Sequence, residues 1–206
     1  MRKVLSILII FYALSFSGFC LAQAPHQVGG FVLGKNISEY NDRLRMDAAI
    51  PVRHMEWINE VEIKHMDGFK SGYIWYGTCS SPGQIIRITL KYADPSKKYY
   101  ERLLKIFKQR FGEPGEWRGD SFHIVLAWKW SFKDEKGNRI GLELQHNTRD
   151  EEMRKGNTLK LRMVNLIEEE AKCYEEKHDD DIQASGEKFL KPLKLKGENL
   201  DLLIPR

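Results

Sequence analysis

The segment DPSKKYYERLLKIFKQRFGEPGEWRGDSFHIVLAWKWSF, residues 94–132, contains the clearest helix and the clearest strand of the chain. Asp94 is a good N-cap, and Pro95 fits the first helical position, where no backbone N–H is needed. Gly112 and Pro114 are typical of the residues that follow a helix. We therefore predict an amphipathic helix between Asp94 and Gly112, with its apolar side formed by Tyr99, Tyr100, Leu103, Leu104, Phe107 and Phe111.

A strongly alternating stretch follows this helix. Every second residue is apolar, at Phe122, Ile124, Leu126, Trp128, Trp130 and Phe132. This period is typical of a strand with one buried face. Asp134 to Asn138 has the composition of a hairpin loop, and shorter alternating stretches come at 140–144 and 159–163. A helix followed by three strands is expected between residues 94 and 166.

The same order of elements is expected upstream. Asn36 and Glu39 frame a capped helix start, and strands are predicted at about 55–63, 71–77 and 86–92. Two consecutive α-β-β-β blocks result, at residues 31–92 and 94–166, without a residue-by-residue repeat between them. We expect an α+β fold with an internal duplication, in which two antiparallel sheets join and the helices pack on one face.

Short motifs in these blocks resemble a known kind of envelope protein. Phe31-Val32-Leu33-Gly34 precedes the first capped helix, and Arg110-Phe111-Gly112-Glu113-Pro114 ends the second. Together with the doubled element order, they resemble the β-lactamase-inhibitor-protein and SmpA/BamE type of small envelope domain. The resemblance implies a binding protein, since one of these families blocks an enzyme cleft and the other assists outer-membrane protein assembly. It implies no functional residue in this chain.

The first 24 residues read as a secretory signal. Arg2 and Lys3 are followed by an almost unbroken apolar run, and Ala22-Gln23-Ala24 has the small-x-small form of a cleavage site. The alternative is an uncleaved anchor helix, for which the run is short. Phe19 before Cys20 argues against lipid attachment. We expect cleavage after Ala24, a periplasmic or secreted protein, and no stable insertion in a membrane.

The rest of the chain is expected to form one domain with a tail. A single domain at 25–178 would end in a third helix at about 166–177, and residues 179–206 would form a charged linker and C-terminal tail. The net charge of +4 falls to +2 once Arg2 and Lys3 leave with the signal. Because basic and acidic residues are mixed along the chain, a nucleic-acid partner is disfavoured. The oligomeric state is not predicted.

Two cysteines remain after the signal, Cys79 and Cys173. An even pair in a chain sent to an oxidising compartment predicts a disulfide. The alternatives are a reactive thiol or a metal pair, but neither cysteine lies in a CxxC motif or close to another metal-ligating residue in the sequence.

Two groups of polar residues are candidates for chemical sites. The first lies between His54 and Asp67, and its spacing fits no common metal motif. The second is the acid–base set Asp120, His123, Glu143 and His146, for which exposed cross-strand pairs are the simpler interpretation. No catalytic serine elbow or phosphate loop is present. We predict no cofactor, no metal and no catalytic residue, so an enzyme is the less favoured class.

The aromatic residues Tyr73, Trp75 and Tyr76 give the binding hypothesis. Tyr73 and Trp75 share one face of their predicted strand, with Tyr76 on the other. Large rigid rings on a sheet face are common anchors of protein interfaces. The alternative is that the third helix or the tail covers them. The expected function is non-enzymatic binding of another envelope or secreted protein, with a cell-envelope glycan-binding module or an undetected hydrolase as alternatives.

Overall fold

The computed structural model describes residues 23–148 and 155–185. The expected signal sequence up to residue 22 and the expected tail from residue 186 lie outside the described residues. No helix within the described ranges is long and apolar enough to cross a membrane.

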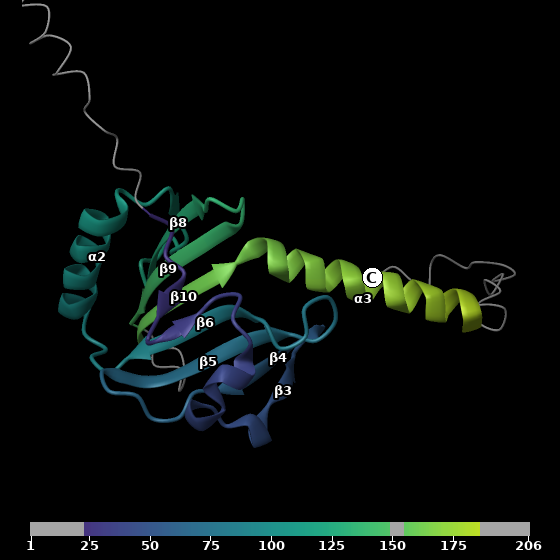
Figure 1. Cartoon of the computed structure of the whole chain (residues 1–206). Coiled ribbons are helices and arrows are strands. Elements are labelled where there is room, and N and C mark those ends of the chain that lie inside the picture. Colours follow the sequence, from purple (N-terminus) through teal and green to yellow (C-terminus); the bar gives the residue numbers. More distant parts are fainter. Residues whose placement is uncertain (1–22, 149–154, 186–206) are drawn as a thin grey trace, which may run out of the picture.

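The structure has an α+β fold, as expected, built on a large antiparallel sheet (Figure 1). The helical elements are the 3₁₀ helices η1 (Ile37–Arg43) and η2 (Met46–Ala48) and the α-helices α2 (Lys97–Phe111) and α3 (Val164–Ser185). The strands are β1 (Gln27–Val28), β2 (Phe31–Val32), β3 (Ile50–Val52), β4 (Met55–Glu62), β5 (Phe69–Gly77), β6 (Ile85–Tyr92), β7 (Glu116–Trp117), β8 (Val125–Lys133), β9 (Arg139–Asn147) and β10 (Gly156–Met163).

The main sheet has eight strands in the order β3-β4-β5-β6-β10-β9-β8-β7. Strands β3 to β6 form one meander and β7 to β10 form another, and the last strands of the two meanders pair in the middle. In that central pair Ile88 lies opposite Leu161, and Leu90 lies opposite Leu159. All four side chains are buried, so the sheet has a continuous core across the junction.

Both meanders differ from the expected three strands. Each has an additional short edge strand, β3 and β7. The first helix is a 3₁₀ segment, although its N-cap forms as expected: the Asn36 Oδ1 accepts a hydrogen bond from the Ser38 N–H at 3.0 Å. Tyr40 then leaves helical backbone angles with φ −125°, just before Asn41 and Asp42, residues of low helix propensity.

Helix α2 starts later than expected. Its N-cap is Ser96, whose Oγ accepts from the Tyr99 N–H at 3.2 Å. Asp94 instead stabilises the turn before the helix by accepting from the Ser96 N–H at 2.8 Å. At the other end Gly112 follows the helix with φ 79°, a backbone angle that favours glycine.

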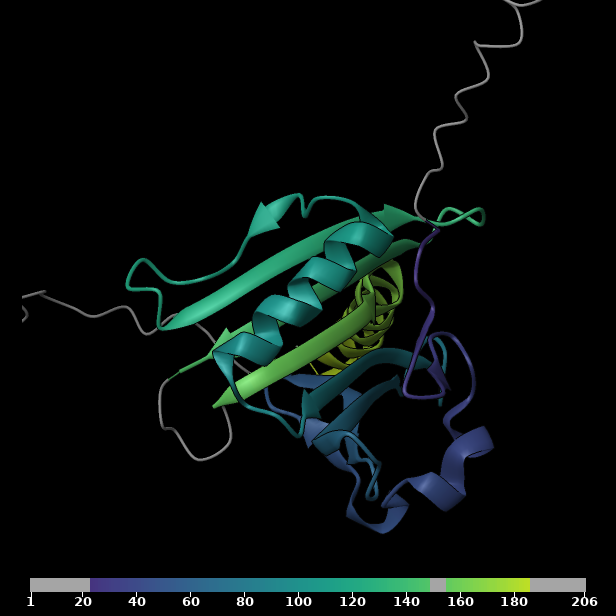
Figure 2. The ribbon, with the colours of Figure 1, turned by 90° about the vertical axis from the view of Figure 1, so that its left-hand side faces the viewer.

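One side of the sheet, the covered face, holds the core. Helix α2 and the N-terminal segment, residues 23–35, lie over it, on the viewer's side in Figure 2. Trp130 is buried there and donates its indole N–H to the Gly112 carbonyl at 2.8 Å. Strand β8 begins only at Val125, so the expectation that Phe122 points into this core is wrong: its side chain is 84% exposed in the turn before the strand.

Helix α3 leaves the sheet on the side opposite α2 (Figures 1 and 2). It is longer than the helix expected at 166–177 and begins directly after β10. The predicted disulfide between Cys79 and Cys173 is present and joins α3 to the loop between β5 and β6, with a Cα–Cα distance of 5.9 Å. Tyr174 packs its ring against Trp57 of β4, so α3 runs along the ends of the strands.

Candidate functional site

The other side of the sheet, which we call the open face, presents partly buried polar and aromatic side chains. Strand pairing sets them in two rows that run across the strands. The first row is Glu60, Trp75, Arg87 and Arg162, on β4, β5, β6 and β10. The second row is Glu62, Tyr73, Thr89, Lys160, Glu143 and Lys129, on β4, β5, β6, β10, β9 and β8. None of these side chains is fully buried.

Trp75 is held in one orientation on this face. Its indole N–H donates to the Glu60 Oε2 at 2.6 Å. The guanidinium carbon of Arg87 lies 4.1 Å from the centre of the indole ring, within the range of a cation–π interaction. A ring fixed in this way loses little conformational entropy when a partner packs on it.

Tyr73 lies beside two acidic side chains in the second row. Burial raises its pKa above the usual value, and the charges of Glu62 and Glu60 add to this shift. The hydroxyl is therefore protonated at neutral pH and can donate a hydrogen bond.

The middle of the second row is an ion-pair ladder. The Lys160 ammonium group donates to the Glu143 Oε1 at 2.7 Å and to the Gln145 Oε1 at 3.0 Å. Lys129, on the next strand, pairs with Glu116 at 3.0 Å. Most charges in this row are therefore neutralised within the face itself.

The three predicted binding residues do not share one surface. Tyr73 and Trp75 lie on the open face. Tyr76 lies on the side of Val61 and Ile74, and its hydroxyl accepts from the Asn59 amide at 3.3 Å. Strand alternation places it there, as the sequence indicates.

The loop beside the aromatic strand is held by a buried carboxylate that the sequence analysis missed. Glu170 of α3 is 0% exposed. It accepts hydrogen bonds from the backbone N–H groups of Thr78, Cys79 and Ser81 at 3.1, 2.7 and 2.6 Å. Glu170 precedes Cys173 by three residues, which is about one helical turn, so the expected disulfide could have directed attention to it.

The acid–base set expected on neighbouring strands is not brought together. Glu143 belongs to the open face, whereas His146 is buried on the covered face with its Nδ1 2.8 Å from the Asn157 Oδ1. Asp120 accepts from the Val125 N–H at 3.0 Å, and the His123 ring packs near Trp117. Each member has a separate structural contact.

The other polar group lies between His54 and Asp67. Groups of three or more potential metal ligands are absent from residues 23–148 and 155–185. His54 sits in the turn before β4 with φ 62°, and the exposed His65 pairs with Asp67 at 3.4 Å.

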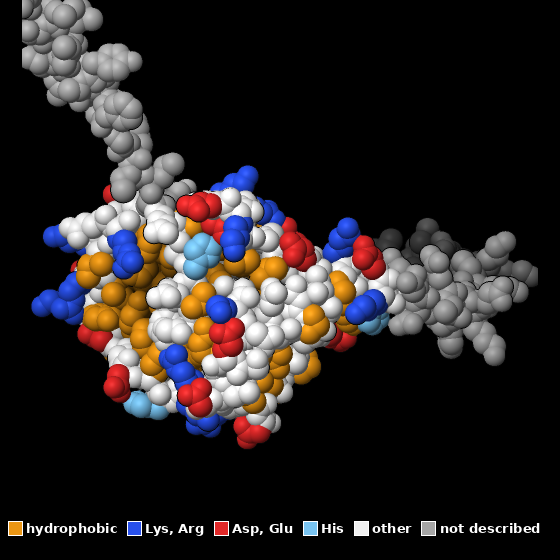
Figure 3. Space-filling model, in the orientation of Figure 1, with side chains coloured by type: hydrophobic (Ala, Val, Ile, Leu, Met, Phe, Trp, Pro, Cys, Tyr) orange, Lys and Arg blue, Asp and Glu red, His pale blue; other side chains and the backbone are white. Residues whose placement is uncertain are grey.

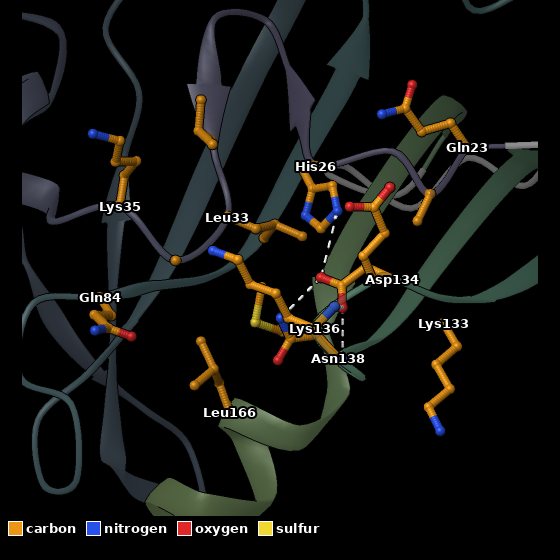
Figure 4. Close-up of a pocket in the computed structure, with 15 residues that line it drawn as sticks. Gln23, His26, Leu33, Lys35, Gln84, Lys133, Asp134, Lys136, Asn138 and Leu166 are labelled. Atoms are coloured by element: carbon orange, nitrogen blue, oxygen red, sulfur yellow. Dashed lines mark hydrogen bonds and ion pairs between the residues drawn. The ribbon is translucent and has the colours of Figure 1, made fainter.

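A hollow of about 980 Å³ lies between the N-terminal segment and the β8–β9 turn (Figure 4). The His26 Nε2 is 3.5 Å from the Asp134 Oδ2 at its edge. Burial raises the pKa of Asp134, but hydrogen bonds from Asn138 and Lys136 and the charge of His26 outweigh this effect and lower it. Because the carboxylate already accepts the N–H groups of its own turn, the pair has a structural explanation.

Apolar side chains also gather between α2 and the N-terminal segment, on the left of Figure 3. They surround a hollow of about 610 Å³ that includes Phe107, Phe111 and Leu142. The rest of the surface visible in Figure 3 carries acidic and basic side chains that alternate without a continuous basic area.

Comparisons with protein-family models, with curated proteins and with solved structures give no significant match to this chain. The geometry of the open face is therefore the basis for a functional proposal.

Proposed function

We propose that this protein is an exported, non-enzymatic binding domain that holds another envelope or secreted protein on the open face of its sheet. The observation that carries the proposal is the arrangement of Tyr73 and Trp75. Both rings are partly buried, lie on the same face of β5, and are flanked by charged side chains of the neighbouring strands. An aromatic centre with a polar surround is typical of protein interfaces.

Export is supported by two features of the chain. The first is the sequence of residues 1–24, which has the form of a secretory signal. The second is the disulfide between Cys79 and Cys173, since disulfides persist mainly in oxidising compartments. The periplasm or the extracellular space is the proposed location.

We also propose that the two meanders descend from a duplicated α-β-β-β block, at residues 31–92 and 94–166. The mirrored strand order supports this, because each half begins with a helical segment and contributes its last strand to the centre. The resemblance to the β-lactamase-inhibitor-protein and SmpA/BamE type of domain belongs to this proposal, and it agrees with a binding role.

A protein partner is favoured over a glycan by the setting of Trp75. Sugars stack on the flat face of an aromatic ring, and Arg87 already lies over one face of this indole. Glu60 fixes its edge. The surroundings therefore suit side chains that combine apolar and charged groups.

The test is affinity capture from a crosslinked envelope extract of the native cell, with the oxidised protein as bait. We expect a stoichiometric protein partner whose recovery falls at least about tenfold with the double substitution Tyr73→Ala and Trp75→Ala, since central aromatic residues often contribute about 2 kcal/mol or more to binding. Phe122→Ala is the matched control, because this exposed ring lies outside the open face.

Equal recovery with the double variant and with Phe122→Ala would show that the open face is not the interface. Binding of cell-wall glycan fragments without a captured protein would favour the glycan-binding alternative.

A further inference from the structure

Two arginines occupy directly opposite positions at the centre of the open face. Arg87 of β6 and Arg162 of β10 are direct partners across the strand pair that joins the two meanders. Like charges directly opposite each other in a sheet reduce stability. Selection for stability alone would favour an acidic residue at one of these two positions. The neighbouring Lys160–Glu143 pair has such an arrangement.

Neither guanidinium group is neutralised by a direct ion pair in the described part of the chain. The Nε of Arg87 is buried and has no hydrogen-bond partner there. No hydrogen bond or ion pair joins Arg162 to another described residue. The buried Arg87 Nε is not accessible to an acceptor from outside, so the donors that the centre of the face offers are those of the partly exposed Arg162 guanidinium.

The two side chains lean in opposite directions. Arg87 lies over the Trp75 ring on β5. Arg162 extends over Gly141 of β9, where a Cβ atom would come within 3.0 Å of the Arg162 Nε. The space above the β6–β10 pair lies between the two guanidinium groups. The Thr89 side chain, also on β6, is next to it on the same face.

The charges near this space favour a small anion. Burial and the charge of Arg162 lower the pKa of Arg87, whereas the charges of Glu143 and Glu60 raise it. A guanidinium nevertheless keeps its charge at neutral pH. With Lys160 included, three cations stand against two carboxylates, a local net charge of +1. One carboxylate would balance it, whereas a polyanion would meet the acidic side chains on both sides.

We propose that the Arg87–Arg162 pair binds a carboxylate of the partner protein, from an aspartate, a glutamate or the C-terminus. This inference rests on the proposed function, since it specifies what the open face recognises. Arg162 can hold a carboxylate with two parallel hydrogen bonds, and the negative charge near Arg87 offsets the repulsion of the two cations. Trp75, fixed by Arg87, packs on the neighbouring residue of the partner.

The test is an NMR titration of the full-length expressed chain with its disulfide formed, in which the Nε–Hε signals of the two arginines are followed. The probes are the peptide acetyl-Gly-Glu-Gly-Glu-Gly-amide, its counterpart with glutamine at both positions, and inorganic phosphate. We expect saturable shifts of both signals with the glutamate peptide only. In Arg162→Gln the affinity falls at least about tenfold.

Arg102→Gln is the matched control. Arg102 lies on α2, and its guanidinium is 5.2 Å from the Tyr99 ring, so this variant removes a cation of the same kind away from the open face. It should leave the titration unchanged. Arg162→Lys keeps the charge but loses the two-pronged geometry, and we expect it to recover only part of the affinity.

Equal shifts with the glutamine peptide, or stronger shifts with phosphate, would overturn the carboxylate assignment. If no probe shifts the two signals while capture of a partner still depends on Tyr73 and Trp75, the carboxylate inference fails and the proposed function stands. If capture is also independent of those rings, both fail.

Discussion

At the scale of single residues, the buried polar atoms without partners are the least expected features of this fold. Tyr100 of α2 is an example. Its buried ring packs against His146, and its hydroxyl has no hydrogen-bond partner in the described part of the chain. Burial raises its pKa to about 12. The helical spacing of residues 94–112 predicts that Tyr100 faces the core, but it does not indicate whether the hydroxyl finds a partner.

We expect Tyr100→Phe to increase the free energy of unfolding at pH 7 by about 1 kcal/mol, because the variant no longer buries an unpaired hydroxyl. The effect should grow in alkali. The unfolded chain loses the tyrosine proton near pH 10 and the folded protein near pH 12, so wild-type stability falls as the pH rises between these values. The variant should lose about 1 to 2 kcal/mol less over this window, a value that allows for solvent screening.

Urea unfolding at pH 7 and at several values between about pH 9 and pH 11.5 measures both effects. Some alkaline loss should persist in the variant, because burial also raises the pKa of Tyr92. A variant less stable than wild type at pH 7 would show that the hydroxyl makes a favourable hydrogen bond.

At the scale of elements, α3 is fixed to the sheet by two attachments one turn apart, the disulfide of Cys173 and the carboxylate of Glu170. The carboxylate satisfies three N–H groups of the loop between β5 and β6, and the adjoining Gly77 has no room for a side chain, since a Cβ there would collide with the Glu170 carboxylate. These contacts therefore fix the position of α3 relative to the loop between β5 and β6.

We expect Glu170→Gln to reduce the free energy of unfolding by about 2 to 4 kcal/mol. The amide has one acceptor oxygen in place of two, and its NH₂ group would face backbone donors. Glu169→Gln is the matched control because Glu169 is exposed, and its effect should stay within about 0.5 kcal/mol. Chemical unfolding of the oxidised proteins provides the comparison.

Repeating this comparison in a Cys79→Ala, Cys173→Ala background would show whether the two attachments act together. Neighbouring contacts that hold one loop are expected to deviate from additivity. Equal stabilities of the Glu170→Gln and Glu169→Gln variants would contradict the role assigned to the buried carboxylate.

The elements that depend on local sequence were predictable, and those that depend on distant partners were not. The alternation at 122–132 gives the inward parity of Trp130 correctly, because period two is a property of the strand itself. It gives the start of β8 incorrectly at Phe122, because only pairing with β9 decides where the strand begins. The edge strands β3 and β7 have too few residues to produce a pattern.

The same distinction applies to the candidate site. Tyr73 and Trp75 were placed on one face by alternation alone. The Arg87–Arg162 pair depends on the pairing of β6 with β10, which no local pattern encodes. Glu170 was hidden in an acidic stretch of a helix that has the composition of an exposed surface.

At the scale of the whole molecule, the pairing of β6 with β10 joins the two meanders of the described chain, and both contribute to one core. Leu161 lies at this junction, fully buried and opposite both Ile88 and Leu142. The halves should therefore unfold in one cooperative step, although each is continuous in sequence.

We expect Leu161→Ala to cost about 3 kcal/mol of stability, in the range found for buried leucines, while the transition stays single. Far-UV circular dichroism and tryptophan fluorescence should give the same midpoint. Leu126→Ala, a half-buried leucine on β8, is the control and should cost less. Two separate transitions in Leu161→Ala would mean that the meanders are independent units.

The last part of α3 gives the molecule a spacer of defined length. Beyond Cys173 the helix continues to Ser185 and projects away from the sheet (Figure 1). At about 1.5 Å per residue, these 12 positions carry the chain about 18 Å past the disulfide. The disulfide acts as a fixed pivot, so every residue inserted after it would lengthen the standoff by about 1.5 Å and rotate the exit of the chain by about 100°. Ser185 thus lies at a set distance and direction from the open face.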